Sequence, residues 1–170
     1  MGKVRIGVLG AGDVAQHTYL PGIARLGREG HLELAAVCDA VEERGGRAAS
    51  LHRIPQAFTN YDEMLERGGI DAVVNLTPMQ LHAEMTLRAI AAGKHVYTEK
   101  PIATTLADAD RVIAAASEAG RVLACAPALM THPESQEIKG LIAGGAIGKT
   151  CYVRARGSHP ARLFPAWRCR

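Results

Sequence analysis

Residues 4–15 read VRIGVLGAGDVA, and this stretch decides the fold. Apolar residues alternate with small or polar ones from Val4 onward, which predicts a strand that ends at Gly10. The residues that follow have the form G-x-G-x-x-A, and a helix is expected from about Asp13. A strand, a glycine turn and a helix in this order are typical of the first unit of a dinucleotide-binding domain.

Strand and helix alternate along the rest of the first 126 residues. We expect further strands at 32–37, 72–76, 95–98 and 122–126, and helices at 41–52, 61–66, 78–92 and 105–119. The last two helices are expected to face the core through Leu81, Met85, Ala89 and Ile90, and through Leu106, Ala109, Ile113 and Ala116. Short connections between alternating elements predict an α/β Rossmann fold with a doubly wound parallel sheet.

The regular alternation of strands and helices ends after Pro127. A helix is expected at 135–143, with Ile138, Leu141 and Ile142 facing inward, and a strand at 151–155. We therefore predict an NAD(P)-binding domain over residues 1–126, followed at 127–170 by the truncated beginning of an α+β domain for substrate binding and oligomerisation.

Composition restricts the partners. The formal net charge is +3, from 20 Lys and Arg against 17 Asp and Glu, and because no long run of like charges occurs, nucleic acid is not an expected partner. The residues from Met1 to Ile6 show no apolar leader segment and no apolar run reaches membrane length, so we expect neither a secretory leader nor a membrane span. The four cysteines, at 38, 125, 151 and 169, form no C-x-x-C pair, so we expect buried thiols, no metal site and a cytoplasmic protein.

The glycine turn carries the first chemical prediction. Gly10 permits the tight turn, Gly12 lets the backbone approach a pyrophosphate, and Ala15 allows the helix to pack closely on the strand. The phosphates would meet free N–H groups at the positive end of the helix. The alternative is a glycine turn that serves chain geometry alone.

Asp39 follows the second predicted strand, where a carboxylate can accept hydrogen bonds from the adenosine ribose. It favours NAD slightly over NADP, although Arg44 and Arg47 are close enough in sequence to reach a 2′-phosphate. The alternative role for Asp39 is to cap the next helix.

Glu99, Lys100 and Pro101 follow the strand at 95–98, at the sheet edge where open α/β folds bind ligands. A lysine there can donate to a substrate oxygen and stabilise alkoxide character as hydride is transferred, so Lys100 is the predicted catalytic residue. The alternative is a solvated surface lysine.

Several motifs together resemble the Gfo/Idh/MocA family of glucose-fructose oxidoreductases and inositol dehydrogenases. They read GVLGAG at 7–12, NLTP at 75–78 with His82, GKHVYTEKP at 93–101 and GAIGK at 145–149. The resemblance implies an oxidoreductase that moves hydride between NAD or NADP and a sugar, polyol or related hydroxy compound. Carried over by position, it implies pyrophosphate contacts at Gly10, Gly12, Asp13 and Val14, ribose contacts at Asp39, a cofactor cleft lined by Thr77, Pro78 and His82, and a nicotinamide end faced by Glu99, Lys100 and Pro101. His82 has packing as its alternative role.

The sequence also departs from the family. In members of that family, the second domain carries a D-x-x-x-H-type motif. That motif has no match in this sequence, and His159 lies too early to replace its histidine. We hypothesise that the basic, proline-containing end reflects truncation or a change of reading frame. Two alternatives stay open: a non-catalytic dinucleotide-binding fragment, and an S-adenosylmethionine methyltransferase, which would not explain Lys100. An uncovered apolar edge would favour a homo-oligomer.

Overall fold

The computed structural model describes residues 2–127 and 131–156. The chain divides into two compact units, Met1–Ala128 and Leu129–Arg170. The basic end with His159, at 157–170, lies outside the described residues.

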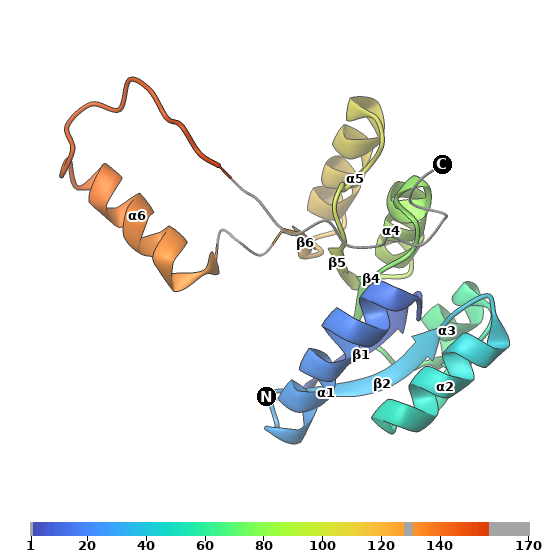
Figure 1. Ribbon diagram of the computed structural model, residues 1–170. Coiled ribbons are helices and arrows are strands. Elements are labelled where there is room, and N and C mark those ends of the chain that lie inside the picture. Colours follow the sequence, from blue (N-terminus) through green and yellow to red (C-terminus); the bar gives the residue numbers. More distant parts are fainter. Residues whose placement is uncertain (1, 128–130, 157–170) are drawn as a thin grey trace. The chain divides into compact units, whose positions relative to one another are not determined.

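The first unit is built on a six-stranded parallel sheet in the order β3-β2-β1-β4-β5-β6 (Figure 1). The strands are β1 (Val4–Leu9), β2 (Leu32–Cys38), β3 (Gln56–Phe58), β4 (Ala72–Asn75), β5 (His95–Thr98) and β6 (Leu123–Cys125). The chain builds β1, β2 and β3 outward in one direction and then crosses back to place β4 on the other side of β1. This is the predicted doubly wound Rossmann topology, and its switch point lies between β1 and β4.

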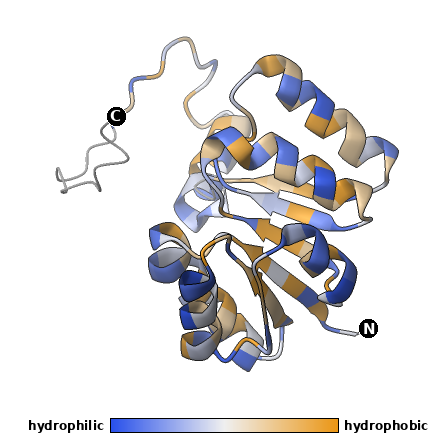
Figure 2. Ribbon diagram, turned by 90° about the vertical axis from the view of Figure 1, so that its right-hand side faces the viewer, coloured by the Kyte–Doolittle hydropathy of each residue, from blue (hydrophilic) through white to orange (hydrophobic). Residues whose placement is uncertain are grey.

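Helices cover both faces of the sheet. They are the π-helix η1 (Ala15–Tyr19), α1 (Leu20–Arg28), α2 (Glu42–His52), α3 (Tyr61–Arg67), the short 3₁₀-helix η2 (Met79–Leu81), α4 (His82–Ala91) and α5 (Leu106–Glu118). One buried cluster packs Leu20 and Ile23 of α1 and Ala48 of α2 against the sheet, and the other packs side chains of α3, α4 and α5. Figure 2 shows the hydrophobic strands between these helices.

The register explains which side chains share a face. Val8 of β1 lies between Val37 of β2 and Val74 of β4, and Val74 pairs in turn with Tyr97 of β5. The three valines and Tyr97 belong to the apolar cluster that contains α1. Tyr97 therefore lies on the α1 side of the sheet, where it is half-buried.

The first unit differs from the sequence-based prediction in three places. Strand β3 was not predicted, because it has only three residues and no alternating pattern can be read over so short a run. Leu81 is exposed, since it ends η2 rather than belonging to α4. Leu106 is 86% exposed and Ile113 is 54% exposed, because α5 lies on the sheet through Val112 and Ala116 instead.

The second unit contains α6 (Pro133–Ala143), which matches the expected helix at 135–143. Ile138, Leu141 and Ile142 were expected to face inward, but all three are exposed. Residues 150–156 were expected to contain a strand and form none. The described part of this unit, residues 131–156, contains no strand.

Within residues 2–127 and 131–156, no helix combines the length and the apolar character needed to cross a bilayer.

Candidate active site at the carboxyl edge of the sheet

The predicted site residues follow the ends of four neighbouring strands. Gly10 follows β1, Asp39 follows β2, Thr77 lies two residues after β4, and Glu99 follows β5. Because all strands are parallel, these ends meet at one edge of the sheet, on both sides of the switch point. The structure thus brings these residues to the carboxyl edge of the sheet, where doubly wound folds have their ligand crevice at the switch point.

The glycine turn needs its first glycine for steric reasons. Gly10 has a φ of 92°, and a Cβ atom built there would lie 2.8 Å from the carbonyl oxygen of Leu76. The Gly10 N–H donates to the carbonyl of Cys38 at 2.8 Å, which fixes the turn across the ends of β1 and β2. Only glycine combines this φ with this close approach of the chain after β4.

The second glycine leaves space instead. A Cβ atom built on Gly12 would have no neighbour within 4 Å. Helical turns begin at Asp13, which is exposed, and continue through the half-buried Val14 to Ala15, which is 1% exposed against the sheet. The free space therefore lies over the N-terminal end of a helix, which suits a phosphate group.

Asp39 is joined directly to the glycine turn. The Ala11 N–H donates to Oδ2 of Asp39 at 2.8 Å, and the Val41 N–H donates to Oδ1 at 2.8 Å. Asp39 is not the N-cap of α2, since that position is occupied by Val41. Arg44 Nε lies 3.8 Å from Oδ1, so a cation stands beside the carboxylate as the sequence spacing suggested. A carboxylate can accept about four hydrogen bonds, and two sites are in use, which leaves acceptor capacity at the crevice.

Asn75 organises the loop after β4. Its side chain is fully buried: Oδ1 accepts from the Thr77 hydroxyl at 2.7 Å, and Nδ2 donates to the carbonyl oxygen of His82 at 3.2 Å and to the Thr86 hydroxyl at 3.3 Å. This buried amide is satisfied on both sides, as a polar group inside a core must be. It holds Thr77, half-buried, and the exposed Pro78 at the edge of the crevice.

His82 connects two loops. The ring is 2% exposed; Nε2 lies 2.9 Å from the carbonyl oxygen of Thr77, and Nδ1 lies 2.6 Å from that of Pro101. Both ring nitrogens thus face backbone acceptors, which matches the packing role that the sequence left open. The ring therefore lies between the loop after β4 and the loop after β5.

The loop after β5 presents a carboxylate and a lysine. The Lys100 N–H donates to Oε2 of Glu99 at 2.9 Å, and the Tyr19 hydroxyl donates to Oε1 at 2.5 Å. The Lys100 side chain is exposed, and the Lys100–Pro101 peptide bond is cis. Burial and the bonds to Glu99 and Tyr97 raise the pKa of Tyr19 above its ordinary value, so this phenol is a hydrogen-bond donor at neutral pH.

Three residues of this site were not predicted from the sequence. Asn75 and Tyr97 lie inside the quoted motifs but received no role, and Tyr19 was not considered. A buried polar residue at a strand end was a usable signal for Asn75. Nothing local marks Tyr19, because its partner Glu99 is 80 positions away in the chain.

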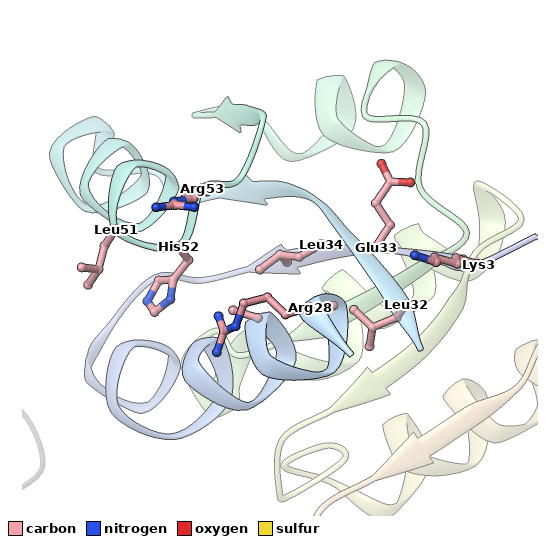
Figure 3. Close-up of a pocket in the computed structure, with 10 residues that line it drawn as sticks. Lys3, Arg28, Leu32, Glu33, Leu34, Leu51, His52 and Arg53 are labelled. Atoms are coloured by element: carbon pink, nitrogen blue, oxygen red, sulfur yellow. The ribbon is translucent and has the colours of Figure 1, made fainter. Parts of the chain in front are cut away.

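A cavity of ≈ 610 Å³ lies at the opposite edge of the sheet (Figure 3). Its two arginines, Arg28 and Arg53, lie at the carboxyl ends of α1 and α2. Positive side chains there complement the helix dipoles, which accounts for their positions structurally. The candidate site is therefore assigned from strand ends and chemistry rather than from cavity size.

The fold and the glycine crevice define a class: a Rossmann domain built to bind a dinucleotide. Gly10 allows the tight turn against the backbone of Leu76, and Gly12 leaves the space above it open, so the residues present fit a pyrophosphate. Among the described residues, no group of three metal-ligating side chains occurs.

The chain belongs to the GFO_IDH_MocA family, an oxidoreductase family with an NAD-binding Rossmann fold, whose sequence model matches residues 4–126. It is 37% identical over 159 residues to a dTDP-3,4-didehydro-2,6-dideoxy-alpha-D-glucose 3-reductase from Streptomyces violaceoruber, covering 94% of this chain and 45% of that protein. It is 35% identical over 167 residues to a 1,5-anhydro-D-fructose reductase from Ensifer adhaerens, covering 96% of this chain and 48% of that protein.

Among solved structures, the chain is similar to KijD10, a 3-ketoreductase from Actinomadura kijaniata crystallised with TDP-benzene and NADP. The TM-score is 0.77 at 32% identity, over 87% of this chain and 46% of that one. The chain thus spans about half the length of the relatives that it matches. The family resemblance inferred from the motifs is confirmed.

Proposed function

We propose that this chain is the cofactor-binding part of an NAD(P)-dependent oxidoreductase that acts on a sugar, a polyol or a related hydroxy compound. One observation carries the proposal: the Asp39 carboxylate accepts the N–H of Ala11, between the two glycines of the turn. The ribose-binding carboxylate and the phosphate-binding loop of a dinucleotide site are therefore locked in one geometry. The names of the relatives support the substrate class.

The residues at the crevice would divide the work. Gly12 and the N–H groups at the start of the helix would hold the pyrophosphate, and Asp39 the adenosine ribose. The bound nicotinamide would supply or accept hydride. Lys100, exposed after β5, would donate to the substrate oxygen and stabilise its negative charge as that transfer proceeds. The wall of the cofactor cleft, between the ribose site and Lys100, would be formed and supported by Thr77, Pro78 and His82.

Replacing Gly12 by alanine tests the binding claim. No described atom lies within 4 Å of the added Cβ, so the protein should fold normally while the methyl group occupies the space of the phosphates. We expect the Kd for NADH, followed by its fluorescence, to rise by about tenfold or more, equal to ~1.4 kcal/mol. Gly46→Ala is the matched control, since Gly46 lies in α2 with equally free space. Absence of saturable NADH binding by the unaltered chain would end the proposal.

A second candidate is a dinucleotide-binding chain that turns over no substrate by itself. The observation that favours it is the coverage of less than half of each relative. We propose that residues 127–170 begin the substrate domain, in keeping with the division of the chain between Ala128 and Leu129. Assays with sugar and polyol substrates separate the two candidates. If turnover is found, Lys100→Ala should lower its rate by about 10².

A further inference from the structure

Tyr19 occupies an irregular position in the first helix. Residues Ala15–Tyr19 form a π-helix between the glycine turn and α1, and Tyr19 is its last residue. Such wide turns within α-helices are rare and occur frequently at functional sites. Here the wide turn ends at Tyr19, whose side chain contacts Tyr97 of β5 and Glu99 directly after it.

The Tyr19 hydroxyl lies within a small polar cluster. It donates to Oε1 of Glu99 at 2.5 Å and lies 3.2 Å from the Tyr97 hydroxyl, and the two rings pack with centroids 5.8 Å apart. The cluster lines a cavity of ≈ 430 Å³ that Lys100 also lines. A chain of side chains thus runs from the helix after the glycine turn to the proposed catalytic loop.

Glu99 passes this contact on to Lys100. One carboxylate oxygen accepts from Tyr19, and the other accepts from the backbone N–H of Lys100. A carboxylate held at both oxygens has a fixed plane, and the backbone bonded to it is fixed too. The backbone position in turn decides where the exposed Lys100 ammonium can reach.

We propose that Tyr19 is a positioning residue for Lys100, acting through the Glu99 carboxylate. This inference rests on the proposed function, since it assigns Tyr19 to the site where Lys100 would meet the substrate. Tyr19 is protonated at neutral pH, as an ordinary phenol is, and burial and its hydrogen bonds raise its pKa further, so it is able to donate. Tyr97 has the lesser role of supporting the phenol.

Amide hydrogen exchange of Lys100 tests the proposal without requiring turnover. In the whole 170-residue chain, Tyr19→Phe removes the hydroxyl and leaves the ring. We expect the Lys100 amide to exchange about tenfold faster or more, since its acceptor is no longer held, while amides of α4 keep their rates. Where turnover is measurable, kcat should fall and the KM for the cofactor should stay the same.

Tyr61→Phe is the matched control. Tyr61 also loses a hydroxyl bonded inside the core, to the carbonyl of Met85, and its described hydrogen bond does not involve Glu99 or Lys100. The proposal is wrong if Tyr19→Phe leaves Lys100 exchange unchanged, or if Tyr61→Phe accelerates it equally. Should Tyr19→Phe fail to fold, Glu99→Ala, which removes the acceptor, must release the Lys100 amide, and retained protection there overturns the proposal.

The two hypotheses fail separately. Lack of NADH binding by the unaltered chain would remove the proposed function while leaving the exchange result interpretable as a structural coupling. Normal NADH binding combined with an unaltered Lys100 amide in Tyr19→Phe would remove the role of Tyr19 alone.

Discussion

Nδ1 of His82 lies 2.6 Å from the carbonyl oxygen of Pro101, and this contact joins the start of α4 to the loop after β5. The other ring nitrogen faces the carbonyl of Thr77. A neutral imidazole carries one N–H and donates to one of these oxygens, whereas a protonated ring donates to both. His82 therefore lies between the two loops that border the crevice and donates a hydrogen bond to at least one of them.

Replacing His82 by alanine should destabilise the protein by about 2–4 kcal/mol, because it leaves a cavity and removes the partner of two carbonyls. Urea unfolding measures the change, and His17→Ala, at an exposed position, should change little. A loss as small as that of His17→Ala would show that the His82 contacts contribute nothing to stability.

Gly10→Ala should lower the free energy of unfolding by about 2 kcal/mol or more. The backbone there has a φ of 92°, and the added Cβ would meet the carbonyl oxygen of Leu76. Thermal or urea unfolding measures the loss. Gly12→Ala provides the contrast, since open space should leave its stability close to that of the unaltered chain; equal losses for the two variants would contradict this distinction.

Asp39→Asn should shift cofactor preference toward NADPH. The carboxylate disfavours a 2′-phosphate, and Arg44, 3.8 Å away, would be free to bind one. The ratio of the NADPH and NADH dissociation constants should fall about tenfold, ~1.4 kcal/mol. Asp71→Asn is the control, because Asp71 also accepts a backbone N–H, from Arg5 at 2.8 Å, but lies at the other edge of the sheet. An unchanged ratio in Asp39→Asn would separate this carboxylate from cofactor choice.

The cysteines should differ in reactivity. Burial and the nearby Asp39 charge raise the pKa of Cys38 to about 11, so little reactive thiolate exists at pH 7.5. Cys125 and Cys151 are exposed, although buried thiols were expected, because the first lies on the edge strand β6 and the second in an irregular segment. Peptide mass spectrometry should show that iodoacetamide labels Cys38 at least about tenfold more slowly than Cys151. Comparable rates would mean that the first unit opens readily.

His52 should make stability fall on acidification. Burial and then the charge of Arg28 lower its pKa, and Nε2 has no hydrogen-bond partner among the described residues. As pH falls below about 6.5, the unfolded chain binds the proton first, so the contribution of His52 is full above that pH and is lost below it. Urea unfolding at pH 7.5 and 5.5 should show a smaller acid loss for His52→Gln than for the unaltered chain. An equal loss would exclude this effect.

The contacts within the site explain which of its residues could be predicted from the sequence and which could not. Gly10, Asp39 and Lys100 could be selected because each directly follows a strand, and parallel strand ends must meet. The bond between Tyr19 and Glu99 could not, because it depends on a π-helix and on which face of β5 carries Tyr97. Those features arise only when helix and sheet pack.

Residues 4–15, with the alternation that follows them, determined the parallel sheet and the kind of cofactor that its edge can hold, because periodicity and glycine geometry are local properties. The tertiary structure alone decided that α5 turns Val112 rather than Ile113 to the sheet, and that His82 holds two loops instead of facing open space. Neighbouring positions on a helix or strand compete for the same buried surface. Only the packing of the whole unit selects between them.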